Sequence, residues 1–444
     1  MSAPYYDEGM ECLPPEGDHR LQEDLFSRQI AYLFKRSPFY QDKLRAAGFG
    51  PESIRGLEDL PKIPFTTKDE LRQSQRQEPP FGRHRACPPE AIVRIYSTSG
   101  TTGTPTYIGL TRHDLELWIR VALRGLWSRG VRPGRRVVSP LGAGPFVGGL
   151  AGDIVDRLGA CLIPLGPGHT DRVVSAFRTA GADTLLATPS YAFHLLHYCA
   201  AHGIDPHSLG MVRCLVAGEP GGGVPSIRRQ IEGAFGCRVL EAMGNGDAGL
   251  SIWAECERGE GMHFMARGML IPEIIDPESG EVLPVQEGVK GELVYTTVDR
   301  ECIPLLRFRT RDHAEVLGTR CGCGRTGYRI RCIGRTDDML IVRGVNVYPS
   351  AVEDVVAAFA PRTTGRIEIL LEGEGPSVEP PVRLRVEHTA SAGDLGTLQR
   401  ELESRLRETL AFRAAVELTA EGTLLRGEYK RQLIRRAGAG SHPV

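Results

Sequence analysis

Between about residues 90 and 245, short apolar runs alternate with segments long enough to form helices. The runs are RRVVSPL, ACLIPLG, DTLLATP, VRCLVAGEP and CRVLEAMG. Strands that alternate with helices predict a mainly parallel sheet whose two faces are covered by helices. Ligands of such sheets bind beyond the carboxyl ends of the strands. The chain is therefore predicted to be an α/β protein with its site at that edge.

The pattern changes twice after this region. Short strand-like runs joined by turns predict a small β-rich subdomain over about 250–334. The runs RIEILLE, VRLRVEH and AAVELTA flank a leucine-rich helical segment, which predicts a compact α+β domain. We therefore expect a large N-terminal domain over 1–334, whose first 20 residues form a loose tail, and a small mobile C-terminal domain over 335–444.

Composition narrows the class of protein. The 444 residues carry a formal net charge of −1, so no overall field attracts nucleic acid or an anionic membrane. The first residues lack the order of a secretion signal, and no apolar run approaches the roughly 20 residues that span a bilayer. Eleven scattered cysteines then predict reduced thiols. We expect a cytoplasmic enzyme without nucleic-acid or membrane partners, with a homodimer as a candidate assembly.

The stretch YSTSGTTGTPT, residues 96–106, is rich in glycine and hydroxyl side chains. Backbone N–H groups freed by glycine, together with hydroxyls, can surround phosphate oxygens. The stretch lacks the G-x-x-x-x-G-K-[ST] pattern of a Walker loop. It follows a predicted strand and precedes a predicted helix. From its own residues, a phosphate loop and a plain surface turn remain equally open.

Several motifs occur in the order of the adenylate-forming (acyl-CoA synthetase) superfamily. The stretch at 96–106 resembles its phosphate loop, AGEP its adenine-side strand end, MGNGDAG its aromatic-Gly motif, and RFRTRD its ribose-binding segment. GRTDDMLIVRGVNVYPSAVE resembles its interdomain hinge. KIPFTTKDEL, IVRIYSTSGTTGTPT and RGVNVYPSAVE are most similar to the phenylacetate–CoA ligase-like aryl-acid ligases. The resemblance extends from about residue 20 to the end of the chain.

This resemblance implies a two-step reaction. ATP and Mg²⁺ would activate an aromatic carboxylic acid as its acyl-AMP with release of pyrophosphate, and coenzyme A would then displace AMP. The nucleotide-binding residues implied are Thr98, Ser99, Gly100, Thr101, Thr102, Gly103, Gly218, Glu219, Pro220, Met243, Gly244, Asp312 and Arg335. The catalytic residues implied are Lys430, Asp247 and Arg335. Asp247 would bind magnesium, and Asp337 would be the hinge.

The sequence also departs from the superfamily pattern. Thr104 stands where many relatives have lysine, and Met243 stands where an aromatic residue packs on adenine. Asp247 replaces a longer glutamate, and Gly246 replaces a hydroxyl residue. These departures allow a third interpretation, a catalytically silent nucleotide-binding relative. A second enzymatic interpretation keeps adenylation but passes the acyl group to a carrier protein or an amine.

Two further sets of residues are candidates for sites. Cys256, His263, Cys321 and Cys323 offer one imidazole and three thiolates, which suit a closed tetrahedral zinc site. Phenylacetate–CoA ligase-like proteins can carry zinc at corresponding positions; the alternative is four unrelated reduced residues. Phe146, Gly148 and Gly149 lie where relatives line the acyl pocket, and the alternative there is a glycine-rich turn with a core phenylalanine.

Overall fold

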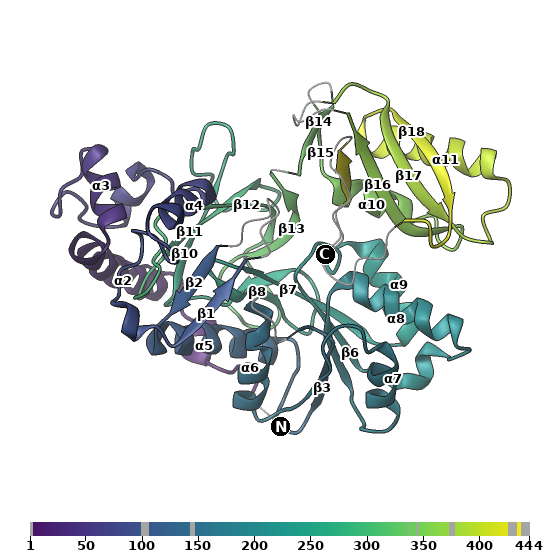
Figure 1. Ribbon diagram of the computed structural model, residues 1–444, viewed down its shortest axis with the longest axis horizontal. Helices are drawn as coiled ribbons and strands as arrows, with labels where there is room; N and C mark the ends of the chain where they lie inside the picture. Colours follow the sequence, from purple (N-terminus) through teal and green to yellow (C-terminus); the bar gives the residue numbers. More distant parts are fainter. Residues whose placement is uncertain are drawn as a thin grey trace. The chain divides into compact units, whose positions relative to one another are not determined.

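The computed structural model describes residues 3–98, 106–142, 147–336, 338–342, 345–372, 378–424 and 433–436 (Figure 1). The chain forms two compact units. The first unit comprises Met1–Ala187, Leu209–Ala217 and Leu240–Arg331, and the second comprises Thr188–Ser208, Gly218–Val239 and Cys332–Val444. The domain boundary at 334/335 stays a prediction from the sequence.

An eleven-stranded sheet has the order β10-β11-β12-β13-β9-β8-β7-β6-β5-β3-β4. The apolar runs of the sequence form β3 (Arg136–Ser139), β4 (Cys161–Pro164), β5 (Thr184–Ala187) and β6 (Arg213–Val216). β3 pairs in parallel with β4 and β5, and β5 pairs in parallel with β6. The predicted α/β fold with a parallel sheet is therefore confirmed for this half of the sheet.

The other half of the sheet is largely antiparallel. It consists of β7 (Arg238–Asn245), β8 (Gly249–Glu255), β9 (Met262–Phe264), β10 (Leu270–Ile275), β11 (Lys290–Thr297), β12 (Phe308–Gly318) and β13 (Arg329–Arg335). The predicted β-rich region is present, but its strands extend the same sheet. The reason is that β7 closes a hairpin with β8 and so joins the two halves.

A separate two-stranded hairpin is formed by β1 (Arg94–Ser97) and β2 (Tyr107–Leu110). The sequence predicted a strand, a loop and then a helix, whereas β2 intervenes before α5 (Arg112–Ser128). The helix begins at a capping box in which the Thr111 hydroxyl accepts from the backbone N–H of Asp114. The glycine-rich stretch is therefore the connection of a hairpin.

Helices complete the first unit. They are α1 (Glu8–Glu11), α2 (Pro15–Arg36), α3 (Pro38–Ala46), α4 (Lys68–Gln77), α6 (Ala151–Leu158), α7 (Thr170–Arg178) and the 3₁₀ segments η1 (Leu57–Lys62), η2 (Pro89–Ala91) and η3 (Val147–Leu150). The inner face of α2 buries Phe26, Ile30 and Leu33 in a core cluster. The period of these apolar residues matches a helix with one covered face.

The second unit contains a four-stranded sheet of order β18-β17-β16-β19. Its elements are α8 (Pro189–Ala201), η4 (Pro206–Leu209), α9 (Pro225–Phe235), β14 (Leu340–Val342), β15 (Val345–Val347), α10 (Pro349–Ala357), β16 (Thr363–Leu371), β17 (Val382–His388), α11 (Leu395–Leu410), β18 (Ala414–Ala420) and β19 (Ile434–Arg436). Leu398, Leu402 and Leu406 of α11 are fully buried in the core of this unit, which confirms the predicted leucine-rich helix. Among the described residues, no helix is both long and apolar enough to cross a membrane.

Candidate active site

Thr98 and Thr106 form the neck of the predicted phosphate loop. The backbone N–H of Thr98 donates to the carbonyl of Thr106 over 3.0 Å, and the two hydroxyl oxygens lie 2.8 Å apart. Both side chains lie at the end of the β1–β2 hairpin. The predicted phosphate contacts of Ser99, Gly100, Thr101, Thr102 and Gly103 lie outside the described residues, and so does Thr104.

The turn between β7 and β8 lies against this neck. A Cβ placed on Gly246 would stand 3.1 Å from the methyl group of Thr98. A Cβ placed on Gly244 would stand 2.6 Å from the carbonyl oxygen of Gly249, closer than folded chains tolerate. A side chain at 246 would therefore press against Thr98. Met243 is half-buried near the end of β7.

Asp247 follows directly on this turn, and its carboxylate is paired with a lysine to which the sequence motifs assign no role. The ammonium nitrogen Nζ of Lys68 lies 2.6 Å from Oδ1 and 2.7 Å from Oδ2 of Asp247. The same Nζ donates to the hydroxyl of Thr106 over 2.6 Å. Lys68 belongs to KIPFTTKDEL, a segment similar to the family but without an expected site residue. The magnesium ligand predicted at Asp247 is therefore a carboxylate already engaged by an ammonium group.

The strand β12 carries Asp312, the predicted ribose ligand, and is tied to the segment that precedes Lys68. The N–H of Thr66 donates to the carbonyl of Arg307, and the N–H of Arg309 donates back to the carbonyl of Thr66, each over 2.9 Å. Asp312 itself is buried, and its backbone N–H donates a hydrogen bond to the Thr310 hydroxyl over 3.0 Å. The first unit thus links the loop neck, Asp247 and the RFRTRD strand by direct contacts.

The arginines of RFRTRD have structural partners. Arg307 forms a buried bidentate pair with Glu273, with donor–acceptor distances of 3.1 and 2.9 Å. Arg309 pairs with Glu292 at 2.6 Å. Neither pair could be read from the motif, because each partner lies on another strand. Asp312 is the carboxylate of the motif, a group that can accept hydroxyl hydrogen bonds.

The other residues predicted to bind the nucleotide lie in the second unit. Glu219 accepts the backbone N–H of Ser190, near the start of α8, over 2.6 Å. Gly218 has a φ of +94°, a left-handed conformation that suits glycine, and Pro220 follows Glu219 in the same turn. Arg335 ends β13. The hinge residue Asp337 and the catalytic candidate Lys430 lie outside the described residues.

The predicted acyl pocket is described only in part. Gly148 and Gly149 lie in η3, which leads directly into α6. Among the described residues, no atom lies within 4 Å of a Cβ placed on Gly148. Phe146 lies outside the described residues. The role of all three residues in an acyl pocket stays a prediction.

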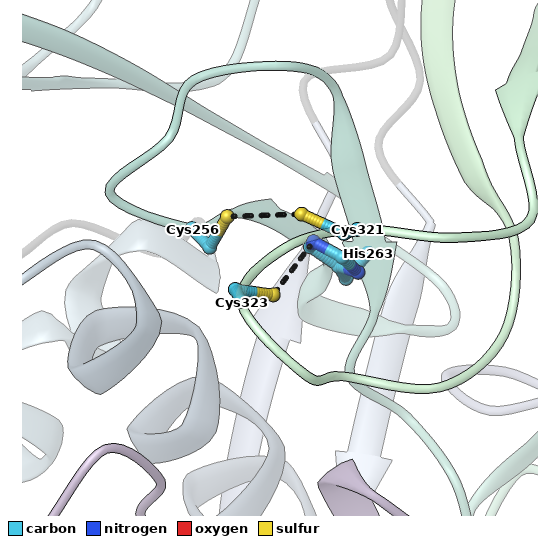
Figure 2. A group of neighbouring side chains, drawn as sticks. All are labelled: Cys256, His263, Cys321 and Cys323. Carbon is cyan, nitrogen blue, oxygen red and sulfur yellow. Dashed lines mark hydrogen bonds between the residues drawn. The ribbon is translucent and has the colours of Figure 1, made fainter.

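The four metal-ligand candidates converge in the first unit (Figure 2). One ligand atom from each of Cys256, His263, Cys321 and Cys323 lies within 4.8 Å of all the others. The Sγ atoms of Cys256 and Cys321 are 3.8 Å apart, and Sγ of Cys323 is 3.5 Å from Nε2 of His263. With zinc–sulfur bonds of about 2.3 Å and a zinc–nitrogen bond of about 2.0 Å, tetrahedral ligand atoms lie about 3.5–3.8 Å apart. These residues therefore fit a tetrahedral zinc ion.

The electrostatics of the cluster also favour thiolate ligands. The hydrogen bond with the Cys256 thiol, and after it the contact with His263, hold the pKa of Cys323 far below its ordinary value. The same hydrogen bond, together with burial, raises the pKa of Cys256. These shifts favour the deprotonated form of Cys323, which is the form in which a cysteine binds metal.

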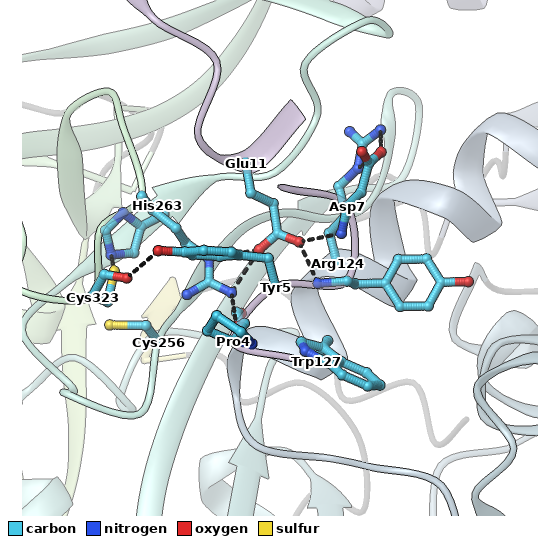
Figure 3. A network of polar contacts seen from close by, with 12 residues as sticks. Pro4, Tyr5, Asp7, Glu11, Arg124, Trp127, Cys256, His263 and Cys323 are labelled. Atoms are coloured by element: carbon cyan, nitrogen blue, oxygen red, sulfur yellow. Dashed lines mark hydrogen bonds and ion pairs between the residues drawn. The ribbon is translucent and has the colours of Figure 1, made fainter. Parts of the chain in front are cut away.

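The first residues of the chain pack beside this cluster, so the expected loose tail is wrong for the described part of 3–20 (Figure 3). The Tyr5 hydroxyl donates to the carbonyl of Cys323 over 2.9 Å. Glu11 forms a buried ion pair of 2.6 Å with Arg325, and Asp7 pairs with Arg124 at 2.8 Å. The acidic character of this segment predicts carboxylates exposed to water. In the structure they pair with basic residues that lie more than a hundred positions away in the sequence.

The chain resembles characterised ligases over nearly its whole length. It is 38% identical to a phenylacetate-coenzyme A ligase of Thermus thermophilus over 385 residues, which cover 86% of this chain and 84% of the relative. It is 36% identical to a phenylacetate-coenzyme A ligase of Pseudomonas putida, covering 93% of this chain and 92% of the relative. Residues 344–435 match the family model of the AMP-binding enzyme C-terminal domain.

A solved structure supports the same assignment. The crystal structure of a 2-hydroxyisobutyryl-CoA ligase in the postadenylation state superposes with a TM-score of 0.90 at 29% identity, covering 98% of this chain and 93% of that chain. The predicted superfamily and reaction class, ATP-dependent acyl-adenylate formation followed by transfer to coenzyme A, are confirmed by these relatives. The chain belongs to the phenylacetate–coenzyme A ligase family of AMP-forming acid–thiol ligases.

Proposed function

We propose that this chain activates a small aromatic carboxylic acid with ATP and transfers the acyl group to coenzyme A. One observation carries the proposal: 36% identity extends over 92% of a phenylacetate-coenzyme A ligase. A match over the full length includes both the nucleotide-binding part and the C-terminal domain of such a relative. The reaction begins when a carboxylate oxygen attacks the α-phosphorus of ATP and pyrophosphate leaves. The thiol of coenzyme A then attacks the acyl carbon, and AMP leaves with the carbon–oxygen bond electrons.

The proposed roles follow the chemistry of each group. The loop from Thr98 to Gly103 holds the leaving phosphates with backbone N–H groups and hydroxyls. Asp312 accepts hydrogen bonds from the ribose hydroxyls. Arg335 contacts ribose or phosphate, and Lys430 bridges the substrate carboxylate and the α-phosphate. Because positioning and charge neutralisation dominate phosphoryl-group chemistry, these roles need no covalent intermediate on the protein.

Nucleotide and acid occupy separate proposed surfaces. Gly218, Glu219 and Pro220, with Met243 and Gly244, are the proposed adenine side. The thioether of Met243 can pack on a ring face, although the usual aromatic residue is absent. Phe146, Gly148 and Gly149 are proposed to line the slot for the aromatic ring. In the described part of the chain, no atom lies within 4 Å of a Cβ placed on Gly148, which supports this slot.

Two metal sites belong to the proposal. Cys256, His263, Cys321 and Cys323 are proposed to hold a structural Zn²⁺, because three thiolates and one imidazole leave no open coordination position. Asp247 is the proposed ligand for the Mg²⁺ that accompanies ATP, since magnesium prefers carboxylate oxygens. A cytoplasmic location, a homodimer and a hinge at Asp337 remain predictions from the sequence.

The test is a panel of benzoates, anthranilates and arylacetates with ATP, magnesium and coenzyme A. Pyrophosphate release and an aryl-CoA product for at least one acid are the expected results. Pyrophosphate release without a thioester would instead indicate a carrier protein or an amine as acceptor. ATP binding without turnover of any acid would indicate a catalytically silent relative.

Lys430 provides a second test of the mechanism. The variant Lys430→Ala is expected to lose adenylation by at least about a hundredfold, because it removes the cation at the reacting phosphate. Its affinity for ATP should change far less, since the loop and Asp312 are untouched. Equal loss of binding and turnover would contradict the role given to Lys430.

A further inference from the structure

We infer that Lys68 is a positioning residue of the adenylation site, whose ammonium group joins Asp247 to the neck of the phosphate loop and neutralises that carboxylate. The inference rests on the proposed role of the loop in binding ATP. It assigns a function to a residue to which the superfamily motifs give none. It also supplies a cation near a loop whose residues 98–106 include no lysine or arginine.

The contacts of Lys68 account for all three N–H bonds of its ammonium group. Oδ1 and Oδ2 of Asp247 lie 2.6 and 2.7 Å from Nζ, and the Thr106 hydroxyl lies 2.6 Å from it. The Lys68 and Asp247 side chains are only 20% and 12% exposed. Thr106 in turn contacts the Thr98 hydroxyl at 2.8 Å. A continuous polar path therefore runs from Asp247 through Lys68 to both ends of the loop.

The backbone of Lys68 is held rigidly from both sides. Thr66 is fully buried and bonds to the backbone of β12 through its N–H and its carbonyl, and its hydroxyl donates to the carbonyl of Leu306 just before that strand. Thr67 forms a capping box with Glu70, which fixes the first turn of α4. Lys68 is the first residue of that helix. This fixed backbone places the Lys68 side chain at the first turn of α4, within reach of Asp247 and Thr106.

Among the described residues, Lys68 is the cation that pairs with the Asp247 carboxylate. Arg300 is buried and donates to the backbone carbonyl of Asp247 over 2.6 Å. His84 is also buried beside the pair, and burial lowers its pKa to about 4, so the ring is neutral near pH 7. Removing the Lys68 ammonium would thus leave Asp247 as a partly buried anion next to a loop that must accept phosphates.

The electrostatic consequence is specific to the triphosphate. An unpaired carboxylate beside the loop repels the β- and γ-phosphates, which carry most of the charge of ATP. AMP lacks these phosphates and is held by adenine and ribose contacts elsewhere. Loss of Lys68 should therefore weaken ATP binding selectively. A change that merely disturbed the fold would weaken the binding of both nucleotides.

The experiment measures binding of ATP and AMP by calorimetry without magnesium, so that no ion substitutes for the ammonium group. The uncharged variant Lys68→Met is expected to weaken ATP binding by about tenfold or more and AMP binding by less than about twofold. The double variant Lys68→Met with Asp247→Asn should restore ATP affinity to within about threefold of wild type, because the stranded charge is gone. Lys68→Arg should retain most ATP affinity, because the positive charge is kept.

The matched control is Lys62→Met, which removes an exposed lysine paired with Asp59 on η1. It should leave both affinities unchanged. The single variant Asp247→Asn tests the pair from the other side and should bind magnesium-free ATP at least as tightly as wild type. Two results would overturn the inference without affecting the proposed function. The first is a Lys68→Met variant that binds ATP as tightly as wild type. The second is a Lys68→Met variant whose affinities for ATP and AMP fall equally and are not restored by adding Asp247→Asn. A wild-type chain that binds neither nucleotide overturns the proposed function and the inference with it.

Discussion

Glu11 and Arg325 lie 314 positions apart in the chain and form an ion pair that solvent hardly reaches. Their carboxylate and guanidinium groups are 2.6 Å apart, and the side chains are 1% and 5% exposed. The guanidinium of Arg325 also lies over the Tyr5 ring, 5.1 Å from its centroid. The pair therefore fastens the start of the chain beside the Cys323 loop.

Breaking this pair from one side is expected to destabilise the first unit strongly. Glu11→Gln leaves a buried guanidinium without its counter-charge, which costs about 3 kcal/mol of unfolding free energy. Urea unfolding followed by circular dichroism measures the loss. The control Glu260→Gln removes an exposed partner of Arg258 and should cost at most about 1 kcal/mol. Similar losses for the two variants would mean that burial does not set the strength of the Glu11 pair.

Metal removal is expected to loosen the first residues, provided that the proposed zinc ion is bound. Cys323 contributes a thiolate to the cluster and its carbonyl to the Tyr5 hydroxyl, so disorder in its loop removes the contact that holds Tyr5. Hydrogen exchange of peptides over 3–13 should accelerate after chelation, while peptides of α11 in the other unit should not change. Elemental analysis of the untreated protein should find about one zinc per chain. Zinc present without any change in exchange at 3–13 would contradict the coupling.

Asp312 is expected to bind both nucleotides through ribose. Asp312→Ala removes a charged acceptor of two hydroxyl hydrogen bonds and should weaken ATP and AMP binding by about tenfold or more. Calorimetry with both nucleotides distinguishes this result from that of Lys68→Met, which should affect ATP alone. The control Asp299→Ala removes a partly exposed carboxylate near His113 and should leave both affinities unchanged.

Gly244 is expected to tolerate no side chain. Gly244→Ala would force a Cβ to within 2.6 Å of the Gly249 carbonyl, and the hairpin that presents Asp247 must distort. The expected loss of unfolding free energy is about 2 kcal/mol or more. Gly233→Ala is the matched control, because Gly233 lies inside α9 and a Cβ added there would meet no atom within 4 Å. That change should stabilise the helix by about 0.5–1 kcal/mol.

His84 is expected to make the stability of the fold pH-dependent. Burial lowers its pKa from 6.5 to about 4, so between these values the unfolded chain binds a proton that the folded chain excludes. The contribution to stability is complete above pH 6.5 and is lost as the pH falls toward 4. Between pH 7 and pH 5 the loss is about 2 kcal/mol.

The variant His84→Asn tests this assignment, because it keeps a polar group beside Ser74 and cannot titrate. Urea unfolding at the two pH values should show a drop that is smaller for the variant by about 2 kcal/mol. His202→Asn changes an exposed histidine next to the end of α8 and should retain the wild-type drop. An unchanged drop in His84→Asn would rule out His84 as its source.

Several elements were predictable because their causes are local. The apolar runs became β3 to β7, and the leucine period became α11, since burial of one face or both faces sets these patterns. The cysteine and histidine spacing predicted the cluster that the structure brings together. In contrast, β2 was missed because its short run YIGL directly follows the glycine-rich loop.

The sequence by itself determined the family, the mixed α/β class and the residues that carry its motifs, because adjacent residues encode strands, helices and loops. Only the tertiary structure decided which distant charges meet. Lys68 reaches Asp247 across 179 positions, and Glu11 reaches Arg325 across 314. The local sequence pattern contains no information on such pairs, because a charged side chain exposed to water is compatible with the same helix or turn as one that is paired. The energy that selects the pairing appears only when folding removes both charges from solvent.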